Sequence, residues 1–274
     1  MSVAVVWFRD DLRVHDNESL ASAVATHDQV VPLYTFDPRQ HETGMFDIRK
    51  KGPHWTRFRR ESVLDLQGSL QDRGGNLLVR TGEAQTVVPE VASEFAADAV
   101  YCQTKAGTEE LKTENVVRAR LAESDIPLER AWTHTLYHLN DLPTAIDEIR
   151  DTYTPWRKSV ENQIFVRDVI GTPPQLSVPT FSDSDTDVPT LEELGVTPVA
   201  VDDRGVLQFK GGESAGKARI DQYFWEGDRL KNYKQTRNGL LGAEFSSKLS
   251  AWLAHGCLSP RYVKEQVEKY EEER

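Results

Sequence analysis

The sequence predicts an α/β fold: an open, Rossmann-like sheet of five parallel strands with flanking helices. A long linker and the start of an all-helical domain are expected to follow. Three observations support this prediction. Short apolar runs alternate with segments of helical spacing in the first half, at 3–8, 29–36, 76–80, 98–103 and 127–134. Residues 171–210 are rich in Pro, Ser, Thr and Asp, and from residue 211 onward the spacing is helical only. Strict alternation of strand and helix implies right-handed crossovers, and therefore parallel strands.

The individual elements follow from local signals. VAVVWF at 3–8 is apolar throughout, as expected of a strand buried on both faces. Asn17 is predicted to cap the helix that follows it. The strand 29–36 is expected to end at the turn Asp37-Pro38.

Three longer helices complete the first half. The segment 53–73 has apolar residues at helical spacing and is expected to stop at Gly74-Gly75. Helices are also predicted over 83–97 and 107–124. The α/β domain is therefore assigned to residues 1–140.

A ligand in an open parallel sheet binds beyond the carboxyl ends of the strands. This rule makes residues 7–11, 36–37 and 103–110 the predicted ligand edge. Glu109 and Glu110 fall in the first turn of the predicted helix 107–124, where the helix dipole favours carboxylates. From spacing alone, complementing the dipole is the preferred role, and hydrogen bonding to a ligand is the alternative.

The second half divides into an interdomain linker, residues 141–210, and the start of a helical domain, residues 211–274. Ser259 and Pro260 have the pattern of an N-cap followed by the first residue of a helix. The helix near residue 215 should face inward with Ala215, Arg219, Ile220, Tyr223 and Phe224.

The last sixty residues carry more apolar side chains than a few short helices can bury against each other. The set is Tyr223, Phe224, Trp225, Leu240, Leu241, Phe245, Trp252 and Leu253. We expect a missing partner surface to cover them, rather than the α/β domain. Trp225 and Trp252 are interpreted as core or domain-interface residues.

Composition limits the possible classes of protein. The chain has 274 residues and a net charge of −11, which argues against a general polyanion binder but allows a local basic patch. Such a charge also suggests the hypothesis of a high-salt cytoplasm. No apolar run could span a membrane and no leader pattern is present, so a cytoplasmic protein is expected. Cys102 and Cys257 are expected to be buried thiols.

Two polar motifs favour structural roles. Arg9, Asp10, Asp11 and Arg13 are expected to form an ion network among themselves. His134 and the histidine four residues later leave a strand for a loop without further ligands, so no metal site is predicted.

The stretch SSKLS comprises Ser246, Ser247, Lys248, Leu249 and Ser250. It places hydroxyls, free backbone N–H groups and a positive charge at a predicted helix start. That combination suits a phosphate, to which Tyr233 could add its hydroxyl. An ordinary serine cap is the simpler alternative.

Several motifs together resemble one family. WFRDDLRVHDN at 7–17 is similar to the opening motif of photolyases and cryptochromes. The segments 135–143, 153–162, 211–225 and 233–261 resemble DASH-type cryptochromes. Small departures are Ala251, Phe245 and His255, where the family commonly has proline, tyrosine and leucine. Family members also continue well beyond residue 274.

The resemblance implies an antenna domain in the first half and the beginning of an FAD domain in the second. It assigns Tyr233 and residues 246–250 to the FAD phosphates. Glu110 would contact a folate antenna, 5,10-methenyltetrahydrofolate. The implied activity is light-driven repair of cyclobutane pyrimidine dimers in single-stranded DNA, by a monomer without membrane contact. The catalytic residues are expected beyond residue 274.

Two other functions stay open at this point. One is a non-catalytic blue-light photoreceptor of the same fold. The other is an isolated α/β nucleotide-binding module, which the match in both halves disfavours. A chain of this length alone is expected to be inactive and to retain little FAD.

Overall fold

The computed structural model describes residues 1–149, 151–200 and 202–274. Five parallel strands form one sheet in the order β3-β2-β1-β4-β5. Their bounds are Val3–Phe8 (β1), Gln29–Phe36 (β2), Leu78–Thr81 (β3), Ala99–Gln103 (β4) and Leu128–Ala131 (β5). The predicted α/β class and strand number are confirmed, with β3 and β5 shorter than expected.

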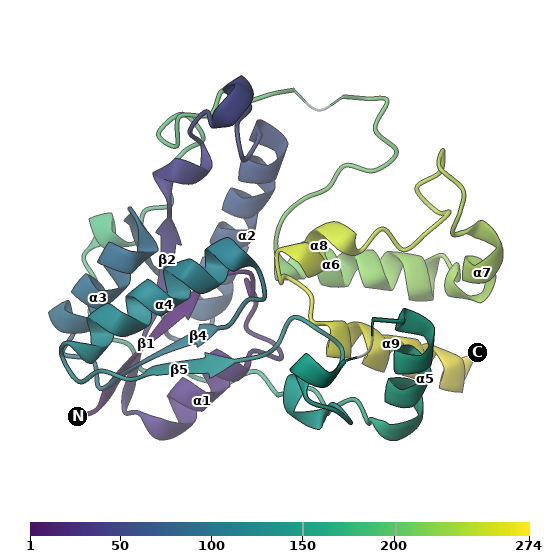
Figure 1. The fold of residues 1–274 in the computed structure, drawn as a ribbon. Coiled ribbons are helices and arrows are strands. Elements are labelled where there is room, and N and C mark those ends of the chain that lie inside the picture. The colour runs from purple at the N-terminus through teal and green to yellow at the C-terminus, as the bar shows by residue number, and fades with distance from the viewer. Residues whose placement is uncertain (150, 201) are drawn as a thin grey trace.

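Helices cover both faces of the sheet (Figure 1). Their bounds are Glu18–Thr26 (α1), Pro53–Gln71 (α2), Ala84–Glu94 (α3) and Thr108–Ala122 (α4). Asn17 caps α1 by accepting a hydrogen bond from the N–H of Leu20, as predicted. The helices α3 and α4 pack together on one face, and α1 and α2 lie on the opposite face.

The second half is helical, as expected. Its helices are Tyr153–Gln163 (α5), Glu213–Ile220 (α6), Tyr233–Thr236 (α7), Ser250–Ala254 (α8) and Pro260–Glu273 (α9), and the π-helical turn Asp221–Glu226 (η6) continues α6. The helix α5 lies within the segment assigned to the linker. Ser259 caps α9 through the N–H groups of Arg261 and Tyr262, as predicted.

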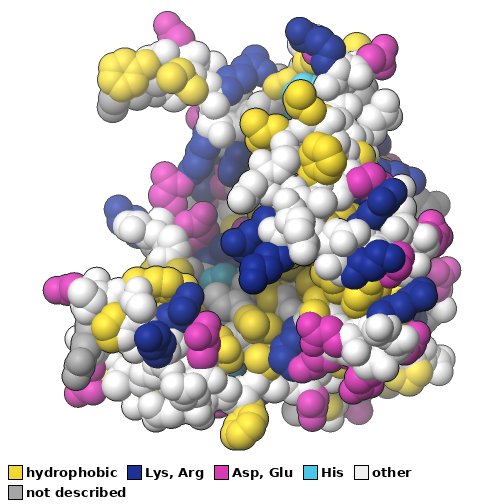
Figure 2. All heavy atoms as spheres, turned by 90° about the vertical axis from the view of Figure 1, so that its right-hand side faces the viewer, with side chains coloured by type: hydrophobic (Ala, Val, Ile, Leu, Met, Phe, Trp, Pro, Cys, Tyr) yellow, Lys and Arg dark blue, Asp and Glu magenta, His cyan; other side chains and the backbone are white. Residues whose placement is uncertain are grey.

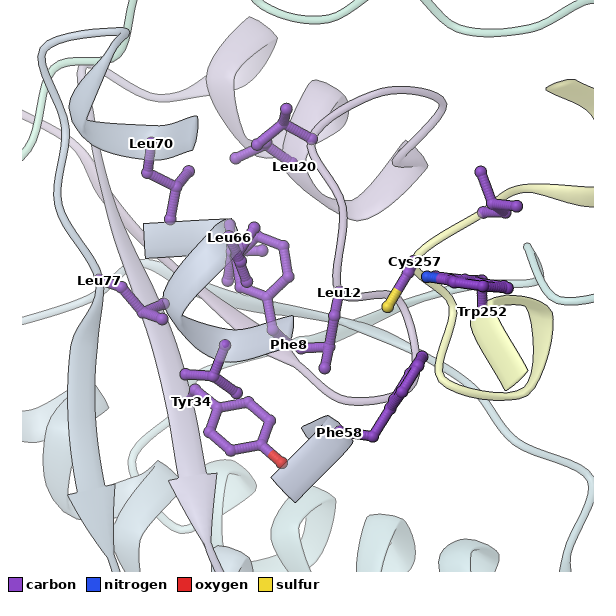
Figure 3. Close-up of a cluster of buried hydrophobic side chains, with 14 of the residues drawn as sticks. Phe8, Leu12, Leu20, Tyr34, Phe58, Leu66, Leu70, Leu77, Trp252 and Cys257 are labelled. Atoms are coloured by element: carbon purple, nitrogen blue, oxygen red, sulfur yellow. The ribbon is translucent and has the colours of Figure 1, made fainter. Parts of the chain in front are cut away.

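The hydrophobic core on the α1 and α2 side continues into the helical half. Figure 3 shows Phe8 and Tyr34 beside Leu66 of α2, while Trp252 and Cys257 approach from the helical half. The rings of Phe58 and Trp252 have centroids 6.0 Å apart. The buried residues of a second core, on the α3 and α4 side, all belong to the α/β domain, and Phe181 of the linker packs against it.

Polar contacts also join the two halves. The buried Asp16 accepts hydrogen bonds from two nitrogens of Arg261, at 3.0 and 2.6 Å. Glu213 accepts one from the N–H of Val14 at 2.7 Å. Removing one partner of such a buried ion pair is costly, so these contacts fix how the helical half sits on the sheet domain.

Only some of the apolar side chains that were expected to lack a covering surface are exposed to solvent. Tyr223, Phe224 and Trp252 are buried, so the prediction that a missing surface covers them is wrong. The large core around α2 covers them instead. Leu240 and Leu241 are 82% and 89% exposed, as the prediction requires.

Candidate functional site

A cleft of about 510 Å³ opens at the carboxyl edge of the sheet, where the sequence predicts a ligand. Residues from all three predicted edge segments line it, including Trp7, Asp10, Asp37, Lys105 and Glu110. The loop after β2 and the first turns of α2 complete it with Arg39, Lys50, Lys51, Trp55 and Arg59. Figure 2 shows a hollowed face on which Lys or Arg and Asp or Glu side chains lie together.

The cleft is rich in cations although the whole chain is acidic. Asp10 pairs with both Arg59 and Lys105. Burial opposes the ionisation of Asp10, but these two cations outweigh it and hold the pKa of Asp10 well below its usual range. The ring of Trp55 has Lys51 and Arg59 within 4.5 and 4.8 Å of its centroid. Cations beside aromatic faces suit a flat, anionic ligand.

Glu110 lies at the rim of this cleft. It stands in the first turn of α4, whose N-cap is Gly107, and its carboxylate folds back over that glycine. Its neighbour Glu109 pairs with Lys50 across the cleft. Within the described residues Glu110 has no cationic partner within 4.0 Å, so its carboxylate is available to a ligand.

The ion network predicted within the opening motif is wrong. Arg9 pairs instead with the buried Glu114, at 2.7 Å, and Asp10 pairs with cations from α2 and the β4–α4 loop. Arg13 donates to backbone oxygens, among them that of Gly256 at 2.8 Å. The ion pairs of the motif therefore reach its surroundings, while hydrogen bonds such as that from the N–H of Arg9 to Oδ1 of Asp11, at 2.7 Å, hold the motif together internally.

The second predicted site lies in the turn before α8. Lys248 has a left-handed backbone, with φ +55°, and Leu249 follows in the right-handed helical region. In the described part of the chain, the five backbone N–H groups of residues 246–250 have no acceptor. A turn of alternating handedness with free N–H groups forms an anion-binding concavity. We call residues 246–250 the amide nest.

The serine-cap alternative does not hold. The helix α8 begins at Ser250 with Leu249 at its N-cap, and no side chain caps it. The segment is instead fixed through its carbonyl groups. Arg219 of α6 donates to the oxygens of Ala243, Ser246 and Ser247, at 2.7, 3.3 and 3.0 Å.

Tyr233 begins α7 and is 37% exposed. Burial raises the pKa of Tyr223, which lies in the η6 turn that follows α6. Tyr223 in turn has the guanidinium of Arg219 at 5.2 Å from its ring centroid. Arg219 thus contacts both the ring of Tyr223 and the amide nest.

The histidine pair has local roles. His134 stacks on Trp132, with centroids 4.2 Å apart, and Nδ1 of His138 accepts from the N–H of Asn140 at 3.1 Å. Both cysteines are free and buried, as predicted.

Sequence reasoning missed Arg219 and Trp55 as site residues, and it placed Lys105 on the ligand edge without giving it a role. Arg219 had a visible signal, because a charged residue was placed on an otherwise apolar helix face. Trp55 had none, since its role depends on how α2 meets the β4–α4 loop over the sheet edge.

The model of the DNA photolyase family matches residues 4–176 of this chain. The chain therefore belongs to the DNA photolyase family. Several curated relatives that it matches carry the more specific name cryptochrome DASH. That of Natronomonas pharaonis is 54% identical over all of this chain and 58% of its own length. That of Arabidopsis thaliana, named as chloroplastic or mitochondrial, is 43% identical over 99% of this chain and 48% of its own length.

Solved structures agree with this assignment. The cryptochrome of Synechocystis sp. superposes with a TM-score of 0.95 at 40% identity, over all of this chain and 56% of its own. A class III photolyase of Agrobacterium tumefaciens gives 0.81 at 23% identity, which shows the shared fold. The chain spans about half the length of the relatives it matches. None of its described helices combines the length and hydropathy needed to cross a membrane.

Proposed function

We propose that the amide nest binds the phosphates of FAD, within a blue-light flavoprotein of the DASH type. The observation that carries this proposal is the run of five free N–H groups beside Lys248. Oriented backbone N–H groups and a nearby cation form strong, charge-assisted hydrogen bonds with phosphate oxygens. The hydroxyls of Ser246, Ser247 and Ser250 are also unpaired within the described residues and add three donors.

The flavin, when bound, supplies light absorption and electron transfer, which no side chain can supply. The role of this chain is to bind and orient it. The nest would hold the pyrophosphate, and Tyr233 would donate its hydroxyl to the same group. The exposed Leu240 and Leu241 lie in the segment between Tyr233 and the nest.

Comparing FAD with riboflavin tests this proposal. Both have the same ring system, but riboflavin lacks the phosphates. We expect the purified chain to carry little flavin, to bind added FAD weakly, and not to bind riboflavin. Lys248→Glu should weaken FAD binding about tenfold by placing a negative charge beside the phosphates. Equal affinity for FAD and riboflavin would contradict the proposal.

For the cleft we propose a light-harvesting cofactor, with 5,10-methenyltetrahydrofolate as the first candidate. Support comes from the aromatic and cationic lining and from the available Glu110 carboxylate. Glu110→Ala should weaken folate binding, measured by quenching of the folate fluorescence. Glu109→Ala is the matched control, because Glu109 is already paired with Lys50. Unchanged affinity in Glu110→Ala would reject the role of Glu110.

We further propose that the whole protein repairs cyclobutane pyrimidine dimers in single-stranded DNA. Family membership supports this activity. The alternative is a photoreceptor without catalysis, which has the same flavin chemistry. Illuminating a single-stranded oligonucleotide that contains a thymine dimer, with the complete protein and FAD, separates the two. Recovery of thymine absorbance supports repair, and its absence supports the photoreceptor.

A further inference from the structure

We infer that Arg219 is the positioning residue of the amide nest. This inference rests on the proposed phosphate site and extends it to a residue outside the nest. Arg219 lies on α6, is 4% exposed, and reaches a loop 24 to 28 residues further along the chain. It touches neither the free N–H groups nor the hydroxyls of the nest.

The contacts of Arg219 explain the orientation of the nest. Its Nε and Nη2 donate to the carbonyl oxygens of Ser247, Ser246 and Ala243, and its Nη1 donates to Oε1 of Gln222 at 3.0 Å. A guanidinium holds its donors in a rigid plane, so it fixes several carbonyls at once. Carbonyls that point inward at Arg219 favour the outward orientation of the neighbouring N–H groups. The left-handed Lys248 then follows directly after Ser247.

The charge of Arg219 adds a second argument. Among the described residues no carboxylate lies within 4.0 Å of its guanidinium, while Glu244 pairs with Arg229 instead. Burial lowers the pKa of Arg219 and the negative charge of Glu244 offsets this only in part, although a guanidinium stays charged at neutral pH. A buried cation without a carboxylate partner is unfavourable. An anion bound in the nest would offset that cost, so the same residue orients the donors and attracts the ligand.

Two substitutions separate these effects. Arg219→Lys keeps the charge and loses the planar fork, and Arg219→Met loses both. The probe is inorganic pyrophosphate, titrated calorimetrically into the 274-residue chain. We expect Arg219→Lys to bind about tenfold more weakly and Arg219→Met more weakly still. Arg157→Met is the control, since Arg157 is a half-exposed arginine of the helical half whose ion pair, with Glu161, lies within α5.

A second readout does not need the ligand. Trypsin cleaves after Lys248, so release of the nest from Arg219 should raise cleavage there relative to cleavage after the exposed Lys234. We expect that ratio to rise in both Arg219 variants and to stay unchanged in Arg157→Met. Circular dichroism and the melting temperature establish that each variant is folded.

The outcomes are distinguishable. Wild-type affinity and an unchanged cleavage ratio in folded Arg219→Met would overturn the inference and leave the phosphate site standing. A lower melting temperature with unchanged affinity per folded molecule would likewise overturn it, because that marks a purely structural residue. Failure of the wild-type chain to bind pyrophosphate would contradict the phosphate site. It would also contradict the role of Arg219 in attracting an anion.

Discussion

At the scale of single residues, the two sites differ in how far the sequence reveals them. The spacing around Glu110 favours only a helix-dipole role, and residues 246–250 suit a phosphate or an ordinary serine cap, so the ligand roles of both come from the family resemblance. Arg219 was placed only on the inward face of a helix. Its role depends on three carbonyls distant in sequence, and no spacing rule records which carbonyls a guanidinium will meet.

His255 is a second residue that only the structure explains. Its ring lies 5.2 Å from that of Trp55 and 4.7 Å from that of Phe58, and its Nδ1 has no partner among the described residues. Burial, and then the positive charge of Arg59, lower the pKa of His255 to about 3. The folded protein therefore holds this ring neutral where the unfolded chain would protonate it.

A pH titration of stability tests this state of His255. The stability that the folded protein gains from a neutral His255 is complete above pH 6.5, the pKa of this side chain in the unfolded chain. It is lost as the pH falls from 6.5 toward 3. At pH 5 the loss is about 2 kcal/mol of unfolding free energy. The charges of Asp10, Lys51 and Lys105 also act on this ring, and they are present both in the wild-type protein and in the variant His255→Leu. His255→Leu should be less sensitive to pH between 7 and 5 in urea unfolding, whereas an equal slope would contradict the neutral state.

At the scale of elements, strands and long helices were predicted well because their signals are local. The strands β1 and β2 begin and end at the predicted residues, and Asn17 and Ser259 cap the predicted helices. The turn after α8 was not predictable, because its shape depends on contact with the strand-end loop. Gly256 has φ +67° there, and a Cβ at that position would lie 1.8 Å from the carbonyl oxygen of Asp10.

This close approach makes Gly256 a sensitive position. Gly256→Ala should lower the free energy of unfolding by at least about 2 kcal/mol, through backbone strain and overlap with Asp10. Gly171→Ala is the control, since a Cβ there meets nothing within 4 Å. Urea unfolding of both variants measures the difference. Equal stability of the two variants would show that the halves do not meet as described.

At the scale of the whole molecule, the acidic charge contrasts with the cation-rich cleft. With 44 acidic and 33 basic residues, repulsion at low salt works against the compact state. Salt screens that repulsion over distances of about 10 Å at 0.1 M. The melting temperature should therefore rise with KCl. Full stability in low salt, with no further gain on adding KCl, would contradict the high-salt hypothesis.

The division into two halves was predictable only in part. The composition change near residue 171 marked the linker, but it did not reveal that one core extends from the sheet to α8. A surface outside the chain was expected to cover the apolar side chains of the helical half, yet Trp252 packs on Phe58 of the α/β domain. Sequence patterns show which side chains need burial, whereas only the tertiary arrangement decides what buries them.

The central claim is that the amide nest is the phosphate site of a flavoprotein. The most direct test is a ¹⁵N–¹H correlation spectrum of the chain, recorded while ADP is added as the phosphate-bearing half of FAD. The account predicts that the amide resonances of residues 246–250 shift downfield together and saturably, and that those of β3 stay in place. Saturable binding of ADP that leaves these five resonances unmoved would contradict it.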